Sequence, residues 1–125
     1  MRVFKTRGFQ RWAHSEGLID SVLCDAVAEI EQGLVEATLG SGLFKKRVPL
    51  PGRGKRGGAR TLLAFRHEDR AAFLFGFRKN DMENIDADEL VVLRGIAKGF
   101  LAYTEPELER ALKEQAFYEV ECHGR

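Results

Sequence analysis

The sequence predicts an α+β domain in which a small antiparallel β-sheet packs against helices. Strand-like runs and segments with helical periodicity follow one another in the order β-α-α-β-β-β-α-α-β. The chain has 125 residues, the size of one domain, and 44% of them are hydrophobic, which is enough for one core. No internal repeat or linker divides the sequence. We therefore expect a single domain over residues 1–125.

The first part of the chain predicts one short strand and two helices. Residues 2–5 are a strand candidate, and Phe9, Trp12 and Ala13 then follow at helical spacing before Gly17. A longer helix starts near residue 20, because its apolar positions recur every three or four residues until a glycine stops it. These positions are Val22, Leu23, Ala26, Val27, Ile30 and Leu34, with Gly33 as the stop signal.

Three strands are expected in the middle of the chain. Residues 43–50 alternate in part, and Pro49 should end this strand because proline cannot pair within a central strand. Residues 51–58 contain four glycines and three basic side chains, which predicts an exposed loop or hairpin tip. Residues 60–66 and 71–77 are predicted to be two central antiparallel strands. The aromatic side chains expected on one core-facing side of the last strand are Phe73, Phe75 and Phe77.

Two helices and a strand are predicted to complete the domain. Asp86 and Glu89 have the spacing of a capping box, and an apolar helical stripe follows them. Thr104 and Glu107 repeat this spacing before a shorter helix. Residues 117–122 alternate as a last strand, which could pair with another chain at a sheet edge.

Several classes of protein are excluded by what the sequence lacks. No run approaches the roughly 20 apolar residues that span a bilayer, and the start lacks the apolar core of a secretory signal, so we expect a cytoplasmic protein without membrane contact. Cys24 and Cys122 lie far apart without a CxxC partner and are expected to be reduced thiols. The three histidines have no metal-ligand spacing, and the glycines of residues 52–57 match GxGxxG without the strand and helix that a dinucleotide site needs. We expect neither a metal nor a cofactor.

The charge distribution points to a polyanion-binding surface. The net charge is only +1, but residues 1–60 hold 11 basic and 6 acidic side chains, whereas residues 61–125 hold 9 and 13. Between residues 41 and 60 there are seven cations and no acid. Such a cluster repels itself unless a counter-charge lies nearby, and a polyanion would supply one. The alternative is a set of solvated side chains at a sheet edge.

The strand over residues 43–50 should present part of this charge on one face. Side chains alternate along a strand, so Lys45 and Arg47 point one way and Lys46 points the other. If the strand that starts at Arg60 pairs with it, Arg60 lies near the face of Lys45 and Arg47. Lys79 follows the next strand and could add a further cation. Cations in this arrangement suit phosphate contacts and the transition state of phosphoryl transfer.

These segments resemble a known family. The runs Leu43-Phe-Lys-Lys-Arg-Val, Pro51-Gly-Arg-Gly-Lys-Arg-Gly-Gly-Ala-Arg and Phe75-Gly-Phe-Arg-Lys-Asn resemble the RelE/HigB superfamily of toxins from bacterial type II toxin–antitoxin systems, most closely the HigB-like branch. The resemblance covers essentially the whole chain. It implies a RelE-like microbial RNase fold, cleavage of mRNA that is generally bound to the ribosome, and neutralisation by a cognate antitoxin protein.

The resemblance also implies site residues. Attack of the RNA 2′-hydroxyl on the adjacent phosphate would need no metal and would give a cyclic phosphate, with Lys45 as the candidate base and Arg47 and Arg60 stabilising the transition state. The catalytic residues implied are Lys45, Arg47, Arg60 and Lys79, and the RNA-binding residues are Lys46, Arg53, Lys55, Arg56 and Arg78.

One alternative to the enzyme stays open at the level of the sequence, and a further role of the cluster is compatible with both. Some members of the family continue with an arginine and a tyrosine, where this chain has Asn80 and then Ile85 or Asp86. A non-catalytic RNA- or ribosome-binding module would use the same basic face. The basic cluster could also receive an acidic segment of the antitoxin.

Overall fold

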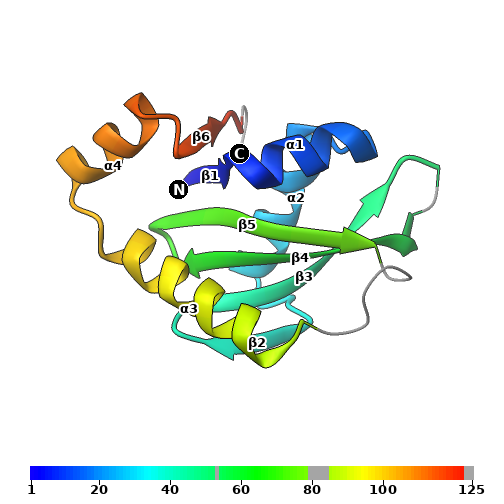
Figure 1. Cartoon of the computed structure of the whole chain (residues 1–125). Coiled ribbons are helices and arrows are strands. Elements are labelled where there is room, and N and C mark those ends of the chain that lie inside the picture. Colours follow the sequence, from blue (N-terminus) through cyan, green and yellow to red (C-terminus); the bar gives the residue numbers. More distant parts are fainter. Residues whose placement is uncertain (53, 79–84, 123–125) are drawn as a thin grey trace.

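The computed structural model describes residues 1–52, 54–78 and 85–122, with only the backbone described at residues 54–57. These residues form six strands and four helices (Figure 1). The strands are β1 (Arg2–Thr6), β2 (Ala37–Gly40), β3 (Leu43–Leu50), β4 (Gly54–Arg66), β5 (Arg70–Arg78) and β6 (Phe117–Val120). The helices are α1 (Arg7–Glu16), α2 (Asp20–Glu31), α3 (Ala87–Ala102) and α4 (Glu105–Lys113). Within this described part of the chain, no helix is long and apolar enough to cross a membrane.

The six strands form one sheet in the order β2-β3-β4-β5-β1-β6. All neighbours are antiparallel except β1 and β5, which run parallel. The expected α+β class with a mainly antiparallel sheet is confirmed. The sequence did not predict β2, so the observed order has one strand more than expected.

Helices cover both faces of the sheet, which gives the domain two core clusters. In Figure 1, α3 crosses in front of the sheet and α2 lies behind it. The cluster under α1 and α2 includes Phe9, Leu23, Val48 and Phe73, and the cluster under α3 and α4 includes Phe4, Leu62, Phe100 and Leu108. These side chains are fully or almost fully buried.

The N-terminal strand occupies an inner position of the sheet, between β5 and the edge strand β6. Its first residue, Arg2, donates hydrogen bonds of 2.9 Å to both carboxylate oxygens of Glu119 on β6. These hydrogen bonds lower the pKa of Glu119 from its ordinary value of 4.5. The ion pair therefore holds the two ends of the folded chain together as long as the carboxyl group is ionised.

The predicted N-caps are confirmed at α3 and α4, and the reciprocal pair of hydrogen bonds is present at α4. Asp86 accepts a hydrogen bond of 2.9 Å from the backbone N–H of Glu89 and so caps the N-terminus of α3. At α4, Thr104 and Glu107 form both hydrogen bonds of a capping box. The helices accordingly begin where the sequence indicated.

Two expectations about the basic hairpin are wrong. Pro49 lies inside β3 rather than ending it, because the register shifts between Val48 and Leu50 and no ladder hydrogen bond is required of the proline. The region expected to be a loop over residues 51–58 belongs to β4 from Gly54 onward. The hairpin is consequently longer, and its turn shorter, than the sequence suggested.

The aromatic residues of β5 do not share one face, as had been expected. The register between β4 and β5 shifts so that Leu63 pairs with Phe73 but Leu62 pairs with Phe75. The extra residue, Leu74, changes the side to which the following residues point. Phe73 is consequently buried under α1, 5.2 Å from Phe9 between ring centroids, whereas Phe75 packs in the cluster under α3.

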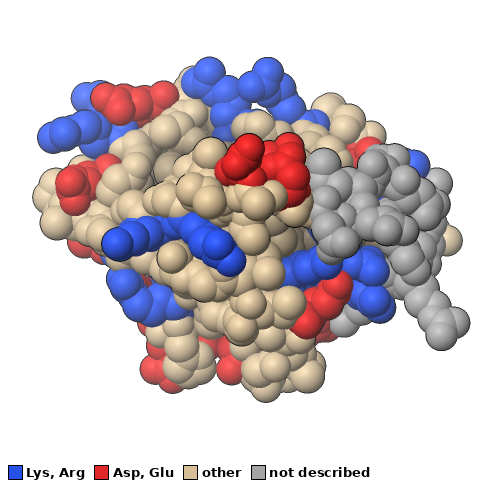
Figure 2. Space-filling model, turned by 60° about the horizontal axis from the view of Figure 1, so that its bottom comes forward, with Lys and Arg blue, Asp and Glu red and all other residues tan. Residues whose placement is uncertain are grey.

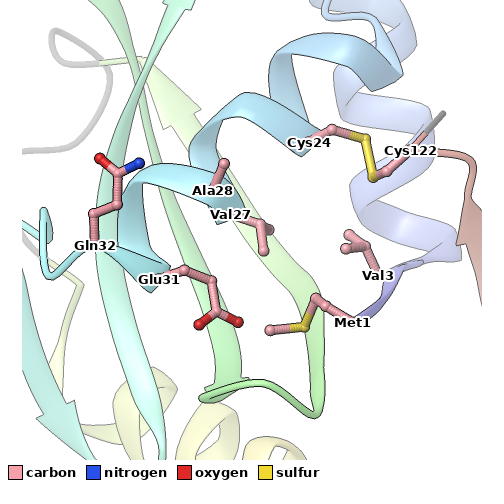
Figure 3. A pocket seen from close by; sticks show the side chains of 8 residues that line it. All are labelled: Met1, Val3, Cys24, Val27, Ala28, Glu31, Gln32 and Cys122. Atoms are coloured by element: carbon pink, nitrogen blue, oxygen red, sulfur yellow. A yellow bond between two sulfur atoms is a disulfide. The ribbon is translucent and has the colours of Figure 1, made fainter. Parts of the chain in front are cut away.

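The two cysteines form a disulfide bond, so the expectation of reduced thiols is wrong. Cys24 belongs to α2, and Cys122 lies two residues beyond β6 (Figure 3). The sheet order places the segment that follows β6 beside α2 at Cys122, which spacing in the sequence does not reveal. The bond borders a pocket of about 270 Å³ that Met1, Val27 and Glu31 also line.

Reduction of this disulfide should destabilise the domain. The bond joins residues separated by 98 positions, and a crosslink over so long a loop restricts the unfolded chain strongly. We expect the free energy of unfolding to fall by about 2–5 kcal/mol in the Cys24→Ala/Cys122→Ala variant, measured by urea denaturation. Reductant should lower the free energy of unfolding of the wild type but not of the variant. Identical urea denaturation curves for wild type and variant, with and without reductant, would show that the disulfide does not form.

Gly76 is predicted to tolerate no side chain. A Cβ atom added at Gly76 of β5 would overlap the ring of Trp12 on α1. We expect Gly76→Ala to lower the free energy of unfolding by about 1–3 kcal/mol. The control Gly99→Ala lies on the exposed side of α3 with open space around it and should be neutral or stabilising by up to about 1 kcal/mol. Urea denaturation measures both free energies of unfolding. A Gly76→Ala variant as stable as the wild type would show that Trp12 does not pack against Gly76.

Candidate nucleic-acid interface

The register of the β3–β4 hairpin brings three of the predicted catalytic cations together. Arg47 lies directly opposite Arg60, and Lys45 lies opposite Leu62. Directly opposite residues share a face of the sheet, so the expected common face of Lys45, Arg47 and Arg60 is confirmed. We refer to these three residues as the cationic cluster. Leu62 is packed under α3, and the cluster therefore continues the α3-side face toward the hairpin turn.

A carboxylate that the sequence analysis did not select lies within the cationic cluster. Glu36 Oε2 is 3.5 Å from Lys45 Nζ and 3.2 Å from Arg60 Nε, and Glu36 Oε1 is 3.2 Å from Arg47 Nε. One side chain thus contacts all three cations. The glutamate side chain is about one quarter exposed, with 25% of its surface accessible.

Backbone pairing holds Glu36 in this position. The residue stands immediately before β2, and its backbone N–H donates a hydrogen bond of 3.0 Å to the carbonyl oxygen of Lys45. The next residue, Ala37, is the strand partner of Lys45. The short strand β2 therefore fixes the carboxylate against the hairpin, which gives this four-residue element a role in the site.

Arg60 has the most specific environment in the cluster. Its side chain is only 9% exposed, and its Nη1 atom is buried without a hydrogen-bond partner in the described part of the chain. Its Nε is held by Glu36. A buried N–H group without an acceptor costs about 1–3 kcal/mol, more when it is charged, so the free energy of the protein would fall if Nη1 gained an acceptor. Arg47, by contrast, is 46% exposed and reaches solvent.

Lys46 and Arg78, two of the predicted RNA-binding residues, lie away from the cluster. Lys46 is 7% exposed, and its ammonium group contacts Glu29 of α2 at 2.7 Å and the carbonyl oxygen of Leu34 at 2.8 Å. Arg78 contacts Glu16 of α1 at 2.5 Å. Both cations are therefore directed toward the face that α1 and α2 cover, and their RNA contacts stay predictions without support from their positions.

The remaining predicted site residues cannot be placed around the cluster. Lys79 and Arg53 lie outside the described residues, as does Asn80. Lys55 and Arg56 belong to β4 by their backbone, and their side chains are not described. Their roles stay predictions.

For four of the seven cations between residues 41 and 60, the nearby counter-charge that the sequence analysis expected comes from the chain itself. Glu36 faces the cationic cluster and Glu29 faces Lys46, so the chain itself supplies these carboxylates. Figure 2 shows that acidic side chains also lie beside basic ones over one face of the molecule. The basic side chains lie there in separate groups, and acidic side chains lie beside several of these groups. The geometry at Arg60, rather than the total charge, therefore indicates an anion site.

The fold and the site define a class of protein: a small α+β domain that carries a cationic cluster on its sheet, in which one guanidinium group is buried and only partly hydrogen-bonded within the described residues. Residues 1–120 match the family model described as the RelE toxin of the RelE / RelB toxin-antitoxin system. The chain belongs to this family and is a toxin of a toxin–antitoxin system, which implies an antitoxin as its partner. None of the curated proteins compared with the chain matches it.

Lys46 is expected to stabilise the folded domain. The Lys46→Met variant loses the contact with Glu29 and leaves the Leu34 carbonyl oxygen without its donor, so the free energy of unfolding should fall by about 1–3 kcal/mol. The control Arg66→Met removes an exposed ion pair with Asp69 and should change stability by less than about 0.5 kcal/mol. Urea denaturation measures both. A Lys46→Met variant as stable as the wild type but unable to bind RNA would instead support the original prediction for Lys46.

Proposed function

We propose that this toxin is an mRNA endoribonuclease of the HigB-like branch that acts in the cytoplasm on mRNA bound to the translating ribosome. The observation that carries the proposal is the convergence of Lys45, Arg47 and Arg60 on one point, with the unpartnered Nη1 of Arg60 beside it. A backbone phosphate is the anion in RNA that matches such a site. RelE-type toxins generally cleave RNA, which agrees with this chemistry.

The reaction proposed is attack of a 2′-hydroxyl on the adjacent phosphate. Negative charge builds up on the phosphate oxygens in the transition state, and cations already fixed in position stabilise that charge without reorganising. Among the contacts of the described residues, Glu36 engages both arginines through Nε. Arg47 is 46% exposed, so its other guanidinium N–H groups can contact phosphate oxygens. The products are a 2′,3′-cyclic phosphate and a 5′-hydroxyl. Lys79, Arg53, Lys55 and Arg56 are proposed as further contacts to the RNA on grounds of resemblance.

The antitoxin would then neutralise the toxin by covering or distorting the cationic cluster. An acidic antitoxin segment could pair with Arg47, the most exposed of the three cations. The same side chains would thus bind the antitoxin in the neutralised toxin and the RNA phosphate in the active toxin, so the two roles of the cluster are compatible.

The proposal is tested by expressing the toxin without antitoxin. Wild type should arrest growth and create new mRNA 5′ ends within translated regions, and Lys45→Ala/Arg47→Ala/Arg60→Ala should abolish both effects. Loss of three transition-state contacts predicts a decrease in cleavage rate of at least about 1,000-fold. Mapping of cellular mRNA 5′ ends, together with growth curves, provides the measurement.

A matched charge-removal variant controls for general effects of lost basic residues. Lys98→Ala/Arg110→Ala/Lys113→Ala removes three cations from α3 and α4, outside the cluster, and should leave cleavage intact. Growth arrest without new 5′ ends would favour a non-catalytic ribosome-binding module. Full cleavage by a folded variant that lacks the cationic cluster would overturn the proposed site.

A further inference from the structure

Cleavage through the 2′-hydroxyl requires a group that accepts its proton, and the cationic cluster contains a carboxylate. We propose that Glu36 is the general base of the reaction and that Lys45 is the general acid. This inference rests on the proposed endoribonuclease function and assigns to Lys45 the opposite role from the one that the sequence suggested.

The contacts of Glu36 leave it able to accept a further hydrogen bond. A carboxylate offers about four lone-pair sites. Among the contacts described, Oε1 is used by Arg47 alone and Oε2 by Lys45 and Arg60. Since a quarter of the side chain is exposed, a substrate hydroxyl can reach it. A hydroxyl bound there would lie next to the phosphate that the two arginines hold.

The chemical states of the two groups favour this assignment over a lysine base. A glutamate is ordinarily ionised at neutral pH and then has only acceptor sites. A lysine is ordinarily an ammonium group, with three donors and no acceptor. A carboxylate is therefore suited to accept the proton of the 2′-hydroxyl, and an ammonium group is suited to donate one to the leaving oxygen.

The step balances with these two groups. The proton of the 2′-hydroxyl moves to the Glu36 carboxylate while O2′ forms a bond to phosphorus. The bond between phosphorus and O5′ breaks, and the Lys45 ammonium group donates a proton to the departing oxygen. This leaves a protonated carboxyl and a neutral amine. The two groups lie 3.5 Å apart in the free protein, so a proton transfer between them restores the starting state once the products have left.

The test compares Glu36→Gln and Glu36→Asp with the wild type in single-turnover cleavage of a labelled mRNA on ribosomes across a range of pH. Glu36→Gln keeps the size of the side chain but cannot accept the proton, so the rate should fall by at least about 100-fold. Glu36→Asp should retain part of the rate and the same loss of activity toward acidic pH. The control is Glu109→Gln, which removes an exposed carboxylate that contacts Arg2 far from the cluster; its cleavage rate should equal that of wild type.

Binding separates a general base from a group that only positions the cations. An mRNA with 2′-O-methyl groups cannot react, and its dissociation constant reports binding alone. Glu36→Gln should bind this RNA at least as tightly as wild type, because it loses a negative charge near the phosphate. A thermal unfolding curve establishes that each variant is folded.

Three results would overturn the inference. Glu36→Gln could cleave within about threefold of wild type, or it could lose cleavage only in proportion to lost binding. The third result is a Glu36→Gln variant that keeps the wild-type loss of activity toward acidic pH while Glu36→Asp is as inactive as Glu36→Gln. If wild type itself creates no new ends on ribosome-bound mRNA, the proposed function fails and this inference fails with it. A cleaving wild type with an equally active Glu36→Gln rejects only the role of Glu36.

Discussion

Two arginines that stand directly opposite each other on paired strands repel, and the β3–β4 register places Arg47 against Arg60 in this way. Lys45 adds a third positive charge two residues along the same face. The carboxylate of Glu36, in contact with all three, offsets this repulsion in the free protein. The site therefore depends on the segment between α2 and β2 as much as on the hairpin that carries its cations.

The sequence was sufficient to separate the basic residues of β3 into two groups. Alternation of side chains predicted that Lys45 and Arg47 would share a face that Lys46 does not. The structure confirms this because Lys46 contacts Glu29 of α2. The sequence did not reveal that a carboxylate belongs to the site. Glu36 reaches the cluster through the pairing of β2 with β3, and the four residues of β2 include a small residue and a glycine, which give little strand signal.

The other incorrect predictions have a similar cause, because they concern pairing between segments that local sequence patterns do not describe. The shift at Pro49 and the extra residue at Leu74 are adjustments of register. A proline is compatible with either a strand end or a bulge, and the residues around Leu74 give no local signal of one. The bond between Cys24 and Cys122 requires β6 to add to the sheet beside β1. By contrast, the capped starts of α3 and α4 depend on residues three apart, and these were predicted correctly.

The inner position of β1 has a consequence for how the chain folds as it is synthesised. Strands β3, β4 and β5 follow one another and pair as neighbours, so the cationic cluster is built from contacts that are close in the sequence. Val3 of β1, however, pairs with Val120 of β6, and this contact can form only after residue 120 has left the ribosome. Pairings across such long separations form slowly because the loop-closure entropy must first be overcome. A nascent chain can thus assemble its cationic hairpin before its first strand gains its second neighbour.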